Sequence, residues 1–172
     1  EPKPKPATTI EELDKRLADA FAKGKVPGAS VTIIEGNQIV FTKGYGYADV
    51  ENKIPATPDT LYPIGGVTQA MTAVLLGVCT DRFLLEVDSG IRRWVPTFPD
   101  DARVRQVLAH VSEGRFNYDP ARYAALTPVV EDCAKQPFRV ALANEILQRL
   151  AMPSSVPGLD LVQAGGQAAR DL

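Results

Sequence analysis

The sequence contains a single histidine, His110, and only two cysteines, Cys79 and Cys133, among its 172 residues. A metal site built from several histidines is therefore not expected, and no cofactor is expected either. Both cysteines lie in segments with a helical pattern. We interpret them as two buried free thiols, with a disulfide as the alternative, because sequence spacing alone cannot establish a pairing.

The sequence also lacks a strong charge bias and a long apolar run. It has 19 Lys and Arg residues against 21 Asp and Glu residues, which gives a formal net charge of −2 at pH 7. Without a basic stripe, nucleic acid is not expected as a partner. No apolar run approaches the roughly 20 residues of a membrane-spanning helix, so no membrane span is expected.

The two ends of the chain differ in composition from its middle. Residues 1–9 begin with EPKPKP, in which proline alternates with charge, and this pattern predicts an extended tail. Such a tether is typical of a chain from which a targeting peptide was removed, which favours an extracytoplasmic (periplasmic or secreted) location, but any arbitrary chain start would look the same. Residues 161–172 are predicted to be a weakly structured tail, and residues 10–160 a single, partial domain.

The first third of the sequence predicts one helix and one β-hairpin. Apolar residues recur at helical spacing over 10–21, Thr8 or Thr9 can cap this helix, and Gly24 ends it. Residues 29–49 predict a hairpin around the turn EGNQ. An isolated hairpin is only marginally stable, so the sheet is expected to need further strands, and none is evident later in the sequence.

The rest of the sequence is predicted to be mostly helical, which makes the fold class α+β (α/β). Residues 67–80 are almost wholly apolar or small, which indicates a helix buried on most of its faces. Further helices are predicted over 103–113, over 120–138 and over 138–152. Pro128 lies inside the second of these and predicts a kink or a break there.

Three stretches match known family motifs in the same order. The first stretch, residues 25–74 (KVPGASVTII…MTAV), is similar to the first strands, the loop and the active-site helix of a known family. The second, residues 104–114 (VRQVLAHVSEG), is similar to the family motif hLLtHtSG. The third, residues 116–123 (FNYDPARY), is similar to the family motif F-x-Y-S-N-x-x-Y. On these motifs the chain resembles the serine β-lactamase and penicillin-binding-protein superfamily, in its class C β-lactamase, DD-peptidase and esterase branch. The resemblance covers roughly residues 10–160. It implies a β-lactamase/transpeptidase-like fold that lacks its late strands.

The resemblance also implies a serine-hydrolase chemistry whose first motif is altered here. In the family, S-x-x-K at the start of the buried helix supplies a nucleophilic serine and, one helical turn later, a lysine that shares its proton. These positions hold Gly66 and Gln69 in this sequence. Gly66 has no side chain that could form an acyl-enzyme, and the amide of Gln69 cannot act as a base near neutral pH.

The second and third family motifs are altered as well. Y-x-N corresponds to Tyr118, Asp119 and Pro120, so a tyrosine that takes part in proton transfer is kept. Pro120 replaces an asparagine that orients substrate in the family. The K-T-G motif of a late strand is not found.

No other residue is an evident replacement for the missing serine. Thr68 is two positions after Gly66 and is expected to point away from the pocket and to pack or cap the helix. Ser112 and His110 are two positions apart and do not face each other on a helix, so Ser112 is expected to bond the local backbone and His110 to lie near the pocket floor. Beside the motif positions Gly66, Gln69 and Tyr118, the candidate binding residues are Thr68, Asp119, Pro120, His110 and Ser112.

Three functions remain open at this point. The first is a catalytically inactive binding or regulatory module, which would hold a small-molecule or peptide ligand in the family pocket or pair with a partner protein. The second is an active or residual serine-type hydrolase of esters, amides or β-lactams. The third is a truncated half of such an enzyme, which would self-associate or need a partner through an exposed sheet edge. We take the first as our expectation.

Overall fold

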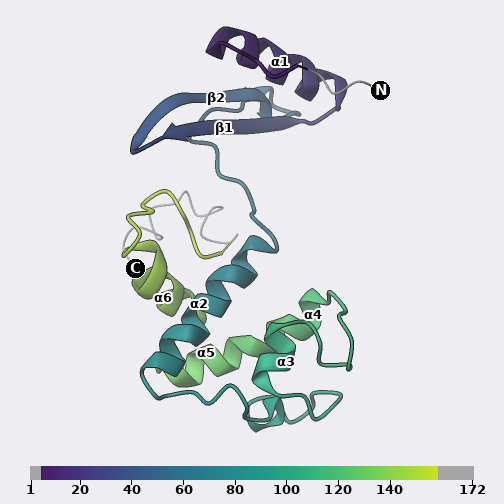
Figure 1. Cartoon of the computed structure of the whole chain (residues 1–172), viewed down its shortest axis with the longest axis vertical. Helices are drawn as coiled ribbons and strands as arrows, with labels where there is room; N and C mark the ends of the chain where they lie inside the picture. Colours follow the sequence, from purple (N-terminus) through teal and green to yellow (C-terminus); the bar gives the residue numbers. More distant parts are fainter. Residues whose placement is uncertain (1–4, 159–172) are drawn as a thin grey trace. The chain divides into compact units, whose positions relative to one another are not determined.

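The computed structural model describes residues 5–158, which divide into two units between Tyr62 and Pro63 (Figure 1). The first unit carries the sheet and the second is helical. The predictions of an extended tail over 1–9 and a single domain over 10–160 stay predictions, and the tail predicted over 161–172 lies outside the described residues.

The first unit consists of one helix and an antiparallel sheet, as the sequence predicts. The helix is α1 (Ile10–Lys23). The strands are β1 (Gly28–Glu35), β2 (Gln38–Asp49) and the short β3 (Ile54–Pro55), in the order β1-β2-β3 (Figure 1). The hairpin between β1 and β2 is therefore confirmed, and β3 adds a third strand that the sequence did not predict.

The start and end of α1 are fixed by the residues that the sequence indicated. The Thr9 hydroxyl accepts a hydrogen bond from the backbone N–H of Glu12 at 3.2 Å, which satisfies one of the free amides of the first turn. The backbone N–H of Thr8 donates to the Glu12 carboxylate at 3.0 Å in return. Gly24 ends the helix.

The carboxylate of Asp14 on α1 links this helix to the sheet by hydrogen bonds. Asp14 accepts two hydrogen bonds from Nζ of Lys43, at 2.9 and 2.7 Å, and one from the Tyr45 hydroxyl at 2.8 Å. Lys43 and Tyr45 share one face of β2 because side chains alternate along a strand. The bonds from Lys43 and then Tyr45 hold the pKa of Asp14 below its usual value. Burial, together with the bond to Asp14, raises the pKa of Tyr45 to about 12.

We expect the contact of Asp14 with Lys43 and Tyr45 to set the pH range over which the first unit is stable. The folded state holds the Tyr45 proton more tightly than the unfolded state, so stability present below the ordinary pKa of 10.0 is lost as the pH rises towards about 12. The lowered pKa of Asp14 gives stability that is present above its ordinary value of 3.8 and is lost as the pH falls through the folded value. Thermal unfolding followed by circular dichroism between pH 2 and 12 measures both.

The matched variant for this prediction is Tyr45→Phe, which keeps the ring that lies 5.2 Å from the Phe21 ring but has no hydroxyl. The variant should lose less stability than the native chain between pH 10 and 12, because it has no hydroxyl at position 45 that could lose a proton. The other tyrosines are the same in both proteins, so they do not contribute to the difference. An alkaline loss of equal size in the two proteins would show that Tyr45 does not couple folding to pH.

The second unit is helical and is built around α2 (Val67–Asp81) (Figure 1). The α-helices that follow are α3 (Val104–Leu108), α4 (Pro120–Tyr123), α5 (Thr127–Ala134) and α6 (Phe138–Leu142). Short 3₁₀ turns lie at η1 (Ile91–Arg93) and η2 (Ala124–Leu126), and a π-helical turn, η3 (Ala143–Leu147), continues α6. The helices surround one core, whose fully buried large side chains are Leu76, Ile91, Val104, Val107, Leu126, Val129 and Val130.

Several helices end earlier than their patterns predict. The helix predicted over 103–113 stops at Leu108, and the one predicted over 120–138 is interrupted at η2. Pro128 lies in the first turn of α5, where its missing N–H costs no hydrogen bond, so the predicted break is confirmed just before it.

The prediction that α2 is buried on most faces is wrong. Only Thr72, Leu75, Leu76 and Cys79 are buried along its length, and Val67 and Val74 are more than half exposed. The buried residues follow the pattern i, i+3, i+4, i+7 of one helix face, so α2 packs one face against α5, α6 and η3.

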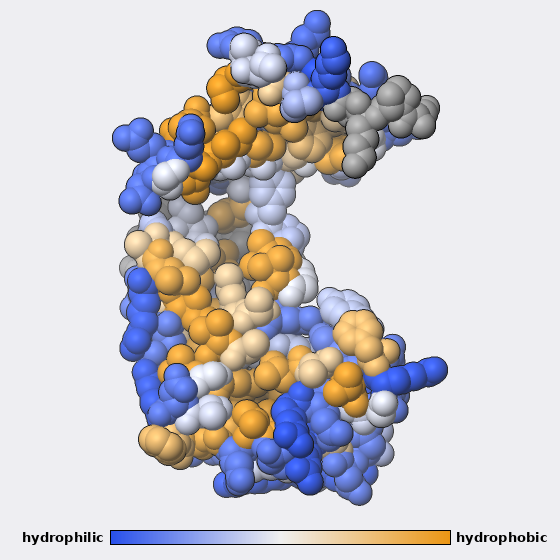
Figure 2. Space-filling model, viewed as in Figure 1, coloured by the Kyte–Doolittle hydropathy of each residue, from blue (hydrophilic) through white to orange (hydrophobic). Residues whose placement is uncertain are grey.

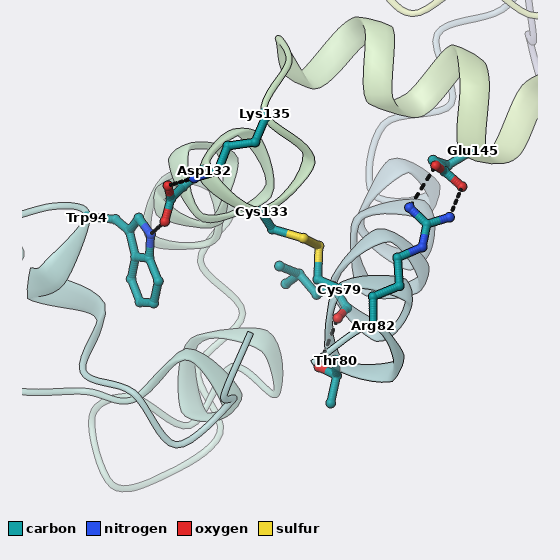
Figure 3. Close-up of a disulfide and its surroundings, with 9 residues drawn as sticks. Cys79, Thr80, Arg82, Trp94, Asp132, Cys133, Lys135 and Glu145 are labelled. Atoms are coloured by element: carbon teal, nitrogen blue, oxygen red, sulfur yellow. Dashed lines mark hydrogen bonds and ion pairs between the residues drawn. A yellow bond between two sulfur atoms is a disulfide. The ribbon is translucent and has the colours of Figure 1, made fainter. Parts of the chain in front are cut away.

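The interpretation of Cys79 and Cys133 as free thiols is also wrong, because they form a disulfide (Figure 3). The bond joins α2 to α5 with 6.0 Å between the two Cα atoms, a separation that suits a disulfide. The two helices pack against each other, and this brings together residues that are 54 positions apart.

Reduction of this disulfide is expected to lower the free energy of unfolding by about 4 kcal/mol, the loop-entropy value for a loop of this length. Urea unfolding with and without a dithiol reductant measures the difference through the fluorescence of Trp94, the single tryptophan. Its indole N–H donates to Asp132, next to Cys133, at 2.8 Å (Figure 3). The control is Cys79→Ala with Cys133→Ala, in which the reductant should change nothing. Equal midpoints for oxidised and reduced native protein would refute the prediction.

Candidate active site

The site begins at the N-terminal end of α2, at the position of the family serine. Gly66 is the N-cap residue of this helix, and Gly65 before it has φ +52, a left-handed conformation that glycine adopts without strain. The backbone amides of residues 67–69 donate to the carbonyls of residues 64–66 at 3.0–3.1 Å. The first turn of α2 is therefore well formed although position 66 carries no side chain.

The hydroxyl of Tyr118 lies where a side chain at position 66 would begin. A Cβ atom placed on Gly66 would be 2.7 Å from Oη of Tyr118. This approach is too close for a Cβ atom, but Oη is the far end of a side chain that is 53% exposed and free to swing away. The structure thus brings the residues of the first and second family motifs together, as the resemblance implies.

Gln69, one helical turn after Gly66, is held by two aromatic residues. Its Oε1 lies 3.2 Å from Nε2 of His110, and its backbone carbonyl accepts a hydrogen bond from the Tyr123 hydroxyl at 2.9 Å. The rings of His110 and Tyr123 are stacked with centroids 5.0 Å apart. Burial raises the pKa of Tyr123, so its hydroxyl remains a donor at neutral pH.

His110 also shapes the loop that carries Tyr118. It has φ +57, which turns the chain away from the helical direction after α3. Its carbonyl accepts a hydrogen bond from the backbone N–H of Asn117 at 2.8 Å, and its ring lies 4.9 Å from the ring of Tyr118 and 6.1 Å from that of Phe116. His110 therefore joins the loop to Gln69, and its expected place at the floor of a pocket stays a prediction.

Arg122 is a residue of this region that the sequence reasoning missed. Its side chain is only 16% exposed and forms ion pairs with Asp100 and, at 3.8 Å, with Glu113. Its Nε donates to the Ser112 hydroxyl at 3.0 Å, and its guanidinium lies 4.8 Å from the centre of the Phe98 ring. Ser112 thus bonds a side chain and not the local backbone as expected. The sequence signal that could have indicated its role is an arginine next to Tyr123, with acidic residues nearby in the sequence.

The remaining candidate residues occupy structural positions. The Asp119 carboxylate caps α4 by accepting the backbone N–H of Ala121 at 2.9 Å and that of Arg122 at 3.1 Å, and Pro120 opens this helix. Thr68 is half-buried in the first turn of α2, and among the described residues no hydrogen bond of its hydroxyl is found. Within the part of the chain that the structure describes, no side-chain hydrogen bond joins these three residues to Gly66, Gln69 or Tyr118.

The side chains that do meet form a hydrogen-bonding site. The Tyr118 hydroxyl, the Gln69 amide and the His110 ring can each donate or accept a hydrogen bond. No nucleophile stands at position 66 and no basic amine at position 69. In residues 5–158, no group of three His, Cys, Asp or Glu side chains is placed to hold a metal ion.

We expect the Tyr123 hydroxyl to matter more for stability than the Tyr118 hydroxyl. Tyr123→Phe keeps the stacking on His110 but removes the hydrogen bond from the hydroxyl to the Gln69 carbonyl, which should cost about 1 kcal/mol. Tyr118→Phe should cost less than half of that, because its exposed hydroxyl is open to water. Urea unfolding of both variants checks the difference, and equal costs would contradict it.

Two relatives show where this chain lies among known proteins. The human serine beta-lactamase-like protein LACTB, mitochondrial, is 34% identical over 151 residues, which are 78% of this chain and 27% of LACTB. Protein flp of Staphylococcus aureus (strain N315) is 30% identical over 109 residues, which are 59% of this chain and 22% of flp. The chain thus spans about a quarter of the length of these curated relatives.

Solved structures show the same fold. The octameric penicillin-binding protein homologue from Pyrococcus abyssi superposes with a TM-score of 0.72 at 23% identity, over 84% of this chain and 44% of that one. The D-amino acid amidase from Ochrobactrum anthropi SV3 also gives 0.72, at 22% identity, over 84% and 50%. The predicted β-lactamase/transpeptidase-like α+β fold is therefore confirmed. The family model described as Beta-lactamase matches residues 10–170, and this chain belongs to the beta-lactamase family.

Proposed function

We propose that this chain is a non-catalytic member of its family, a binding module that holds an amide-, ester- or lactam-containing ligand without a covalent step. One observation carries the proposal. At the N-terminal end of α2, Gly66 stands against the Tyr118 hydroxyl with no side chain between them. Acyl transfer needs a nucleophile at this point, and glycine supplies none.

The ligand class follows from the groups that surround Gly66. Gln69 and Tyr118 offer neutral donors and acceptors, which suit a carbonyl or an amide better than an isolated charge. Phe116 is 71% exposed beside them and offers an apolar surface to a ligand side chain. The structurally similar D-amino acid amidase has been solved with L-phenylalanine and with L-phenylalanine amide, which supports a small amide ligand with an apolar group.

The proposal includes an oxidising compartment as the place of action. Structural disulfides persist in extracytoplasmic and secreted proteins and are rare where thiols are kept reduced. The Cys79–Cys133 bond therefore supports the proposed periplasmic or secreted location. No helix in residues 5–158 is both long and apolar enough to cross a membrane. The LACTB relative is mitochondrial by name, so this location is not general among the relatives.

We also propose that the chain associates with a partner protein or with a second copy of itself. In the described sheet, β1 has a neighbouring strand on one side only. Its residues 28–34 include no charged residue and no proline. Charged residues and proline protect sheet edges from pairing with another strand, so this edge lacks both kinds of protection along residues 28–34. Large apolar side chains also remain on the surface of each unit (Figure 2), among them Ile34, Ile39, Phe83 and Phe116.

The first test is intact-protein mass spectrometry before and after incubation with a penicillin and with a serine-reactive phosphonate. We expect no covalent adduct on the native chain, because no activated nucleophile stands at position 66. A stoichiometric adduct would overturn the non-catalytic proposal. It would favour residual hydrolase activity by another group, which adduct mapping would identify.

Non-covalent binding is tested by calorimetry with L-phenylalanine amide and with the same penicillin. Gln69→Leu has nearly the same volume but no hydrogen-bonding amide, and it should weaken binding about fivefold, the value of one hydrogen bond. The matched control is Gln148→Leu, an exposed glutamine outside the site, which should leave the affinity unchanged. If neither compound binds the native chain, the proposed ligand class is wrong.

A further inference from the structure

The Cys79–Cys133 disulfide closes a loop that contains the side chains facing Gly66 and Gln69. Cys79 lies in α2 itself, ten residues after Gln69, which is about 15 Å along the helix. The residues that meet Gly66 and Gln69 are His110, Tyr118 and Tyr123. All three lie between Cys79 and Cys133 in sequence, so the site segment 110–123 is part of the covalently closed loop.

Inside this loop, the site segment is joined to α2 by few polar contacts. Two of them reach Gln69: the contact of its Oε1 with His110 at 3.2 Å and the bond from Tyr123 to its carbonyl at 2.9 Å. The disulfide joins the loop to α2 at the opposite end of the helix (Figure 3). With the disulfide intact, the loop is fastened to α2 at both ends. Without it, the polar contacts at Gln69 and the core packing remain.

A second contact of α2 near Cys79 is non-covalent. Arg82 donates two hydrogen bonds to the Glu145 carboxylate, each at 3.0 Å (Figure 3). Glu145 lies in η3, and the loop 82–145 that this ion pair closes also contains the segment 110–123. The two contacts near the C-terminal end of α2 therefore differ in strength: one is a covalent bond, and the other is an ion pair whose Arg82 side chain is 47% exposed, and exposed ion pairs contribute little.

The two cysteines of the disulfide differ in exposure. Cys79 is only 4% exposed, whereas Cys133 is partly exposed. A thiolate of a dithiol reductant can attack Sγ of Cys133, forming a mixed disulfide while Cys79 leaves as a thiolate and takes up a proton. The second thiol of the reductant then displaces Cys133 as a thiol. Two electrons and two protons pass to the protein, and the dithiol becomes a disulfide.

We propose that Cys79–Cys133 is a redox-sensitive clamp on the candidate site: the oxidised form holds segment 110–123 against α2, and reduction by a dithiol releases it. The regulatory meaning rests on the proposed binding function, but the structural change does not require a ligand. A test without ligand therefore separates failure of the clamp from failure of the binding proposal.

The test is hydrogen–deuterium exchange of the full chain, oxidised and after treatment with dithiothreitol. Intact mass confirms reduction through a gain of two hydrogens. We expect amides of segment 110–123 to exchange at least tenfold faster in the reduced protein. The hairpin peptide 28–49 is the internal control, because it belongs to the other unit and should exchange at an unchanged rate.

The matched variant is Arg82→Met, which removes the second contact of α2 and leaves the disulfide in place. It should change the exchange of segment 110–123 by less than twofold. The loss of global stability expected on reduction also raises exchange at α2 and α5 through global unfolding, so exchange is measured at several urea concentrations. Three outcomes overturn the proposal: unchanged exchange of segment 110–123 after reduction, an equal rise in the Arg82→Met variant, and the same urea dependence of exchange for segment 110–123 as for α2 and α5 in the reduced protein. The last would mean that the segment exchanges only when the whole unit unfolds, so the bond is a general stabiliser and not a clamp on the site.

Discussion

The packing of one face of α2 against α5 is the contact on which the rest of the second unit depends. It buries Leu75 and Leu76 in the core and brings Cys79 to Cys133, so apolar burial and a covalent bond act at the same place. The same helix presents Gly66 and Gln69 at its other end. The packing on α5 and the disulfide, which hold α2 in place, therefore also maintain the geometry of the site.

The site keeps the framework of a serine hydrolase without its reactive groups. Tyr118 approaches position 66, and the Tyr123 hydroxyl donates a hydrogen bond to the backbone carbonyl of Gln69. The ring of His110 lies next to the Gln69 amide, which needs a hydrogen-bonding partner. These groups suit the proposed non-covalent binding, because preorganised donors and acceptors reduce the entropic cost of binding.

Arg122 links this framework to the rest of the helical unit. Its guanidinium joins the 98–101 segment, through Asp100 and Phe98, to the loop that carries Ser112 and Glu113. A nearly buried arginine is tolerated only where several acceptors compensate its lost hydration. The loop that presents Tyr118 is thus supported on one side by Arg122 and on the other by His110, while the disulfide limits how far the whole segment can move.

The sequence by itself determined the local elements and the identity of the altered motifs. Caps and periodicity placed α1, the hairpin and α2 correctly, since these signals act within a few residues. The resemblance to the family motifs predicted that Gly66, Gln69 and Tyr118 belong to one site. Only the tertiary structure decided the contacts between residues far apart in sequence: the Cys79–Cys133 bond, the ion pairs of Arg122 and the exposed face of α2. Such contacts depend on which helix faces meet, and neither composition nor spacing along a single chain contains that information.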